Sequence, residues 1–84
     1  MAGPLHAMTE YLSYTDFIAD VSIKHEQIFR LFGWRYGQTF FNLLAQANLN
    51  VANLIRATDL DPFFLHEMTE SHRQILERIW NDNR

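Results

Sequence analysis

The sequence predicts an all-α protein, a compact bundle of four helices of which two are longer and two are short. Apolar residues recur at three- and four-residue steps over most of the chain, a spacing that places them on one face of a helix. No segment shows the strict alternation of a β-strand, and residues typical of helix ends separate the periodic stretches. We therefore expect residues 9–84 to form a single helical domain.

The first expected helix begins after Ser13 and ends at Gly33. Ser13 and Asp16 have the spacing of a capping box, in which the serine oxygen accepts a hydrogen bond from a free amide of the first turn. Glycine tolerates the left-handed conformation that is common at helix ends, so Gly33 is the expected stop. The predicted buried stripe consists of Phe17, Ile18, Val21, His25, Ile28, Phe29 and Phe32.

The second expected helix, residues 35–47, is apolar around much of its circumference, as is typical of a central helix. Gly37 in its first turn costs about 0.5–1 kcal/mol relative to alanine in a helix. Close approach of another backbone would explain why a glycine stands there. Asn48 is expected to cap a short third helix, whose buried face comprises Val51, Leu54, Ile55 and Thr58.

Residues 58–62, Thr-Asp-Leu-Asp-Pro, are predicted to form a turn. Aspartate side chains bond nearby amides, and Pro62 keeps the preceding residue out of the helical conformation. Asp61 and Pro62 then have the chemistry to start a short helical turn through Phe63 and Phe64.

Thr69 is the expected start of the last helix, whose predicted buried stripe consists of His72, Ile75, Leu76, Ile79 and Trp80. At the other end of the chain, residues 1–8, MAGPLHAM, show no periodicity. We interpret them as a disordered N-terminal segment or a remnant of cloning.

The composition argues against several classes of function. The chain has no cysteine, and it has no apolar run of the roughly 18 residues that a membrane span needs, so we expect a cytoplasmic protein without membrane contact. The formal net charge of −3 argues against nucleic acid as a partner. Neither metal-ligand spacing nor a nucleophile elbow nor a phosphate loop is present, so we expect no metal, no cofactor and no catalytic residue.

Two separated motifs carry a resemblance. Residues 34–42 read WRYGQTFFN, and residues 52–63 read ANLIRATDLDPF. This middle third to half of the chain resembles small uncharacterised helical proteins of bacterial and phage genomes, whose pattern looks like R-x-G-Q-x-x-F-N and then I-R-G-T-D-x-D-P-F. The resemblance implies one compact domain and a phage or mobile-element source, without an activity. Ala57 stands where the pattern usually has glycine, which argues against a left-handed residue there.

The arginines of this stretch admit two interpretations. Arg35 and Arg56 could bind a small anion such as a phosphate or a carboxylate, with Gln38 on the same helix face as Arg35. We favour the structural interpretation, in which both arginines pair with Asp59 and Asp61 and hold the turn against the second helix.

Nucleic-acid contact is a further alternative. Residues 48–58 are expected to form a short helix after a short connection, in the manner of a helix-turn-helix, and would present Asn50, Asn53 and Arg56 to bases. The net charge weakens this hypothesis, because one cation in that helix supplies few phosphate contacts.

The favoured function is binding of another protein, as an adaptor or inhibitor, or of a second copy of the chain as a homodimer. Twelve aromatic residues are many for so small a core, and aromatic and arginine side chains are enriched at the centres of protein interfaces. The expected partner-binding residues are Trp34, Arg35, Tyr36, Phe63 and Phe64.

Overall fold

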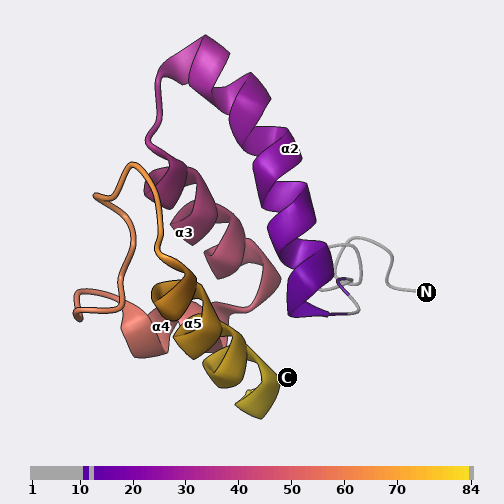
Figure 1. Ribbon diagram of the computed structural model, residues 1–84, viewed down its shortest axis with the longest axis vertical. Coiled ribbons are helices and arrows are strands. Elements are labelled where there is room, and N and C mark those ends of the chain that lie inside the picture. Colours follow the sequence, from indigo (N-terminus) through magenta and orange to yellow (C-terminus); the bar gives the residue numbers. More distant parts are fainter. Residues whose placement is uncertain (1–10, 12, 84) are drawn as a thin grey trace.

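A computed structural model describes residue 11 and residues 13–83, so the segment 1–8 lies outside the described residues. The described part contains four α-helices and no β-strand (Figure 1). The prediction of an all-α bundle of four helices is confirmed. The helices are α2 (Tyr14–Phe32), α3 (Tyr36–Ala47), α4 (Leu49–Ile55) and α5 (Glu70–Asp82).

Local side chains set the helix ends. Ser13, Asn48 and Thr69 each accept a hydrogen bond from the amide three residues further on, at 3.1, 3.2 and 3.0 Å. Gly33 ends α2 in the left-handed conformation with a φ of 70°, and its amide donates to the Phe29 carbonyl at 2.8 Å. The caps predicted for α2, α4 and α5 and the glycine stop are therefore confirmed.

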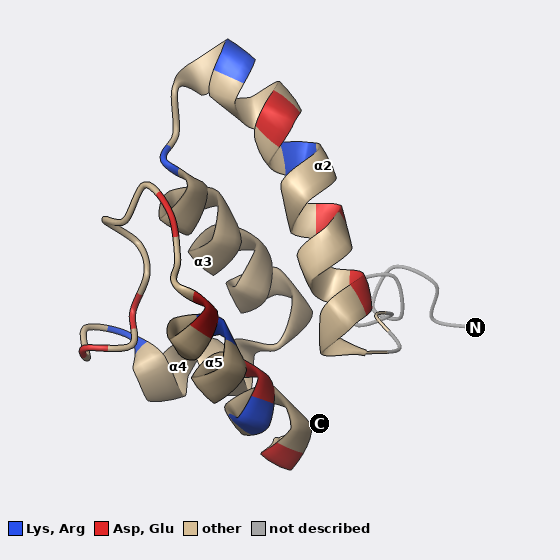
Figure 2. Cartoon of the chain, in the orientation of Figure 1, with Lys and Arg blue, Asp and Glu red and all other residues tan. Residues whose placement is uncertain are grey.

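The helix α3 lies at the centre of the bundle. It runs antiparallel to α2 and also packs against α4, which follows its C-terminal end. The last helix, α5, packs against α2 (Figure 1). The helix carries no charged residue (Figure 2). That composition suits a helix with neighbours on several sides, as its sequence predicted.

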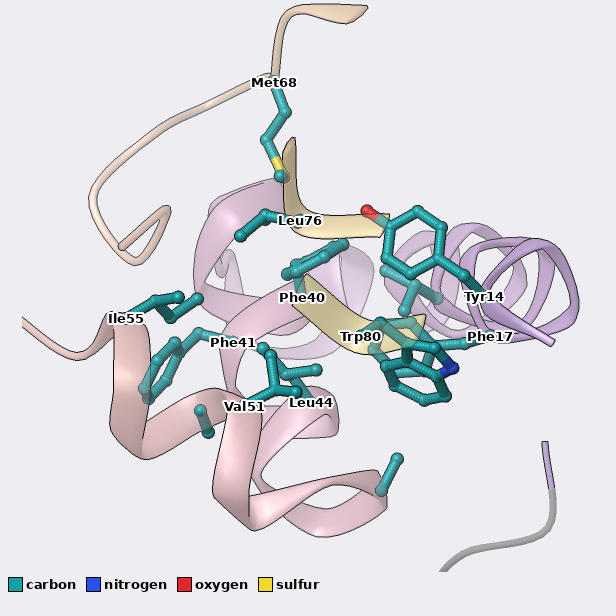
Figure 3. Packing of buried hydrophobic residues seen from close by; sticks show 13 residues of the cluster. Tyr14, Phe17, Phe40, Phe41, Leu44, Val51, Ile55, Met68, Leu76 and Trp80 are labelled. Atoms are coloured by element: carbon teal, nitrogen blue, oxygen red, sulfur yellow. The ribbon is translucent and has the colours of Figure 1, made fainter. Parts of the chain in front are cut away.

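The core is an aromatic cluster around Phe17. This ring stacks on Trp80 with centroids 5.1 Å apart and meets Phe40 edge-on at 5.4 Å, so α2, α3 and α5 join at one point (Figure 3). The buried apolar residues are Tyr14, Phe17, Val21, Phe40, Phe41, Leu44, Ala47, Val51, Ala52, Ile55, Met68, Leu76 and Trp80.

The connection between α4 and α5 packs its backbone onto the start of α3. The Gly37 amide donates to the Leu65 carbonyl at 2.9 Å, and a Cβ at Gly37 would overlap the Pro62 carbonyl oxygen. The predicted close approach of another backbone is thus confirmed. The short turn expected through Phe63 and Phe64 is present: the Leu65 amide donates to the Pro62 carbonyl at 2.8 Å, and the Asp61 side chain accepts from the Phe63 amide at 3.0 Å. The turn does not continue as a helix, and the next helix begins at Glu70.

Ala57 overturns an expectation drawn from the resemblance. Its φ is 62°, so it is left-handed although it is not glycine. The Asp61 carboxylate accepts hydrogen bonds from the amides of Ala57 and Phe63, at 2.8 and 3.0 Å. These two bonds close the turn after α4 and offset the cost of the Ala57 conformation.

Five residues that the sequence placed on buried faces are exposed: Phe29, Phe32, Leu54, Thr58 and Ile75. Leu54 is exposed because α4 buries a narrow face of Val51, Ala52 and Ile55 and turns its remaining side chains to solvent. Among the described residues, no helix is both long and apolar enough to cross a membrane.

Candidate protein-binding surface

The apolar stripe of α2 continues beyond the part of the helix that the bundle covers. Phe32 follows Tyr14 by about five helical turns and therefore lies on the same face. Tyr14 is 6% exposed and Phe17 and Val21 are fully buried, whereas Phe32 is 68% exposed. The same face of one helix thus passes from core to solvent.

The reason is the length of α2 relative to its neighbour. Its 19 residues extend about 28 Å, while the 12 residues of α3 extend about 18 Å. The connecting residues 33–35 span up to about 10 Å before α3 begins, so the end of α2 extends past the start of α3 (Figure 1). The last turns of α2 have no helix of the described bundle against their apolar face.

We define the overhang surface as Phe29, Phe32, Trp34, Arg35 and Phe64. The rings of Phe32 and Trp34 lie 6.0 Å apart, and the Arg35 guanidinium lies 5.3 Å from the centre of the Phe64 ring. These contacts connect the end of α2 with the connection between α4 and α5. Phe64 is 78% exposed, and Phe29 is also exposed.

Arg35 is held in place by Phe63 and Phe64 of the connection between α4 and α5. Its Nε donates to the Phe63 carbonyl at 3.3 Å, and its guanidinium also lies 5.7 Å from the centre of the Phe63 ring. Arg35 is the residue before the first turn of α3, with an extended ψ of 157°. One hydrogen bond and two ring faces therefore orient a single guanidinium group.

The prediction that Arg35 and Arg56 form ion pairs with Asp59 and Asp61 is wrong. Within residues 11 and 13–83 the ion pairs are Lys24–Asp20 at 2.9 Å and Arg30–Glu26 at 3.7 Å. Asp61 instead uses its carboxylate oxygens on two backbone amides of its own turn. The Asp61 carboxylate is thus already hydrogen-bonded within its own turn, and it does not pair with an arginine.

The structure brings Arg56 to Asn53 and not to Arg35. Arg56 Nη2 donates to the Asn53 side-chain oxygen at 3.3 Å, and its guanidinium lies 5.0 Å from the centre of the Phe41 ring. Asn50, Asn53 and Arg56 are all exposed at α4. Gln38 is half-buried in α3, and its amide donates to none of the described residues.

The five predicted partner-binding residues divide into two groups. Trp34, Arg35 and Phe64 belong to the overhang surface. Tyr36 and Phe63 instead pack against the core: the Tyr36 ring lies 5.4 Å from His25, and the Phe63 ring lies 6.3 Å from Phe41.

Sequence reasoning missed Phe29 and Phe32, which it placed on the buried stripe. A usable signal was present in the predicted lengths, because the first helix is longer than any helix available to cover it. Counting turns from Ser13 to Gly33 against those of residues 35–47 predicts an uncovered end.

Polar side-chain groups are also buried where α2, α3 and α5 meet. Burial raises the pKa of the Tyr14 hydroxyl above its ordinary range, with the nearby Tyr36 hydroxyl adding to the effect. Among the described residues, the hydroxyls of Tyr14 and Tyr36 and the Arg73 Nε have no hydrogen-bond partner. The Arg73 guanidinium lies 6.0 Å from the centre of the Tyr36 ring.

Near the start of α2, Asp20 accepts hydrogen bonds from Tyr11 and Lys24, and these bonds lower the pKa of its carboxyl group. No three histidine or acidic side chains within the described residues converge as metal ligands would.

No family model matches the chain, and neither the curated proteins nor the solved structures give a significant match.

Proposed function

We propose that this protein is a small interaction module that binds another protein through the overhang surface. The observation that carries the proposal is the exposure of Phe32, which lies on the helix face that is buried elsewhere along α2. Burying a phenylalanine side chain contributes about 1.5–3 kcal/mol, so Phe29, Phe32 and Phe64 together offer a substantial gain to a partner that covers them.

The make-up of the surface supports the same proposal. Aromatic residues and arginine are enriched at the centres of protein interfaces, where a few large side chains supply most of the binding free energy. Four aromatic rings and one oriented arginine meet this description. The module would act in the cytoplasm as an adaptor or inhibitor, and the motif resemblance favours a phage or mobile-element source.

The double substitution Phe32→Ser/Phe64→Ser tests the proposal. Both side chains are exposed, so the free energy of unfolding should change by less than about 0.5 kcal/mol. Proteins captured from a bacterial lysate by the unmodified chain should be lost at least tenfold on the double variant, as quantified by mass spectrometry.

The matched control is Leu54→Ser, which removes an exposed apolar side chain from α4. It should leave capture unchanged. If the unmodified chain and both variants capture the same proteins in equal amounts, the overhang surface is not the binding site.

Contact with nucleic acid through Asn50, Asn53 and Arg56 has less support. Arg56 is engaged with Asn53 and the Phe41 ring, and the formal net charge is −3. A salt titration against random duplex DNA discriminates the two functions, because phosphate contacts weaken steeply as salt rises.

A further inference from the structure

We propose that the segment bound by the overhang surface is an acidic, apolar stretch of a different protein, with a carboxylate on Arg35, and not a second copy of this chain. This inference rests on the proposed function and names the chemistry of its partner. The argument starts from the state of the Arg35 side chain.

Arg35 is oriented before any partner arrives. Its Nε is bonded to the Phe63 carbonyl, and its guanidinium lies against the Phe63 and Phe64 rings. The two terminal Nη groups donate to no acceptor within the described residues. A guanidinium held in this way offers a planar pair of donors that matches a carboxylate, and it loses less side-chain entropy on binding than a free arginine.

Within the described residues Arg35 forms no ion pair, although the connection that packs on the start of α3 carries the exposed Glu67. Lys24 and Arg30 on α2 are each paired with an acidic residue four positions before them. No acidic residue stands in the first turn of α3, and no side chain caps that turn, so nothing in it neutralises Arg35. The overhang surface itself contains no aspartate or glutamate.

These charges disfavour a symmetric dimer. A two-fold axis through the overhang surface places the same residues on both sides, so Arg35 of one copy faces a surface that has a second Arg35 and no acidic residue. Like charges in a desolvated contact oppose association. A partner with a carboxylate at this point removes the penalty and adds a charge-assisted hydrogen bond.

The rings fix what must flank the carboxylate. The Phe32 ring packs on Trp34, which precedes Arg35 in the chain, and the Phe64 ring packs on the Arg35 guanidinium. Large apolar side chains on both sides of the acidic residue would cover these rings and exclude water from the ion pair. The partner segment therefore carries an aspartate or glutamate between leucine, isoleucine or phenylalanine residues.

Selection from a random peptide library, displayed on phage and panned on the immobilised full chain, tests this chemistry. Counter-selection on the Phe32→Ser/Phe64→Ser variant removes peptides that bind elsewhere. Enriched peptides should contain an acidic residue between large apolar residues. One such peptide is then synthesised with its acidic residue intact and as the corresponding amide, and both forms are titrated by fluorescence anisotropy.

Arg35→Gln should weaken binding of the acidic peptide by about tenfold, and the peptide amide should show a similar loss. The amide should bind the variant no more weakly than it binds the unmodified chain, because the two changes remove one interaction. Arg56→Gln is the matched control: it removes another guanidinium that lies against a ring and should leave the affinity unchanged. Urea unfolding of each variant verifies that it remains folded.

Each other outcome overturns a different statement. Apolar peptides without an acidic residue, bound equally by Arg35→Gln, overturn the inference and leave the proposed function standing. If no peptide discriminates the counter-selection variant, the proposed function fails too. A dimer in light scattering that Phe32→Ser/Phe64→Ser dissociates identifies a second copy as the occupant and overturns the inference.

Discussion

Ala57 occupies a backbone conformation that alanine avoids. With a φ of 62° it lies in the left-handed region, where contact between Cβ and the following carbonyl costs about 1–2 kcal/mol. The Ala57 amide donates to the Asp61 carboxylate at 2.8 Å, and the Thr58 amide donates to the Ile55 carbonyl at 3.0 Å. The turn as a whole therefore imposes the conformation on this residue.

Ala57→Gly should stabilise the protein. Glycine removes the steric cost of the left-handed region but adds about 0.4–1 kcal/mol of backbone entropy to the unfolded chain. We expect the free energy of unfolding to rise by about 0.5–1 kcal/mol, measured by urea denaturation. Ala19→Gly, in the exposed interior of α2, is the control and should lower it by about 0.5–1 kcal/mol. A loss of stability in both variants would contradict the assignment.

The alanine at position 57 argued against a left-handed residue there, and the structure shows one. An alanine is compatible with helix, and its own identity gives no sign of a left-handed residue. The signal lay in its neighbours, because Asp61 is four positions away and its carboxylate caps the turn. Arg35 could not be placed from local sequence either. The sequence allows it an ion pair with an aspartate, but in the structure it contacts the rings of Phe63 and Phe64, 28 and 29 positions later in the chain.

The docking of the α4–α5 connection onto α3 depends on one glycine. The Gly37 amide bonds the Leu65 carbonyl, and the Pro62 carbonyl occupies the place that a side chain would need. This contact also positions Phe64 beside Arg35. The start of α3 therefore links the stability of the connection to the shape of the overhang surface.

Gly37→Ala should displace this connection. Alanine gains about 0.5–1 kcal/mol in helix propensity, but its Cβ would lie 2.9 Å from the Leu65 carbonyl oxygen and overlap that of Pro62. We expect a net loss of about 2 kcal/mol in urea unfolding. Gly33→Ala is the control, since its Cβ would meet nothing within 4 Å; only its φ of 70° is strained, and it should lose about 1 kcal/mol. Equal losses at both positions would argue against the backbone contact.

The free energy of unfolding of the protein should fall at alkaline pH because of Tyr14. Burial raises the pKa of its hydroxyl above the ordinary value of 10.0. Below about pH 10 the group is neutral in both states and its contribution to stability is complete. Above that pH the unfolded chain ionises while the folded chain resists ionisation, so stability falls as pH rises.

Tyr14→Phe should remove this part of the pH dependence. Because the hydroxyl has no partner among the described residues, the variant should be as stable as the unmodified chain at about pH 7, or more stable by up to about 1 kcal/mol. Urea unfolding at about pH 7 and about pH 11 measures both effects. The same decline in both proteins over this interval would show that Tyr14 ionises freely in the folded state.

The helices and their ends could be read from the chain because the forces that set them are local. Ser13, Asn48 and Thr69 bond amides three residues away, and the stripe of α2 follows from the helical repeat. The glycine at position 37 also predicts a close backbone neighbour, but it does not identify the segment that supplies it. Exposure is different in kind. Phe32 lies on the predicted apolar face of α2, but it is exposed because the end of α2 extends past the start of α3. This is a relation between two helices, and no local sequence pattern contains it.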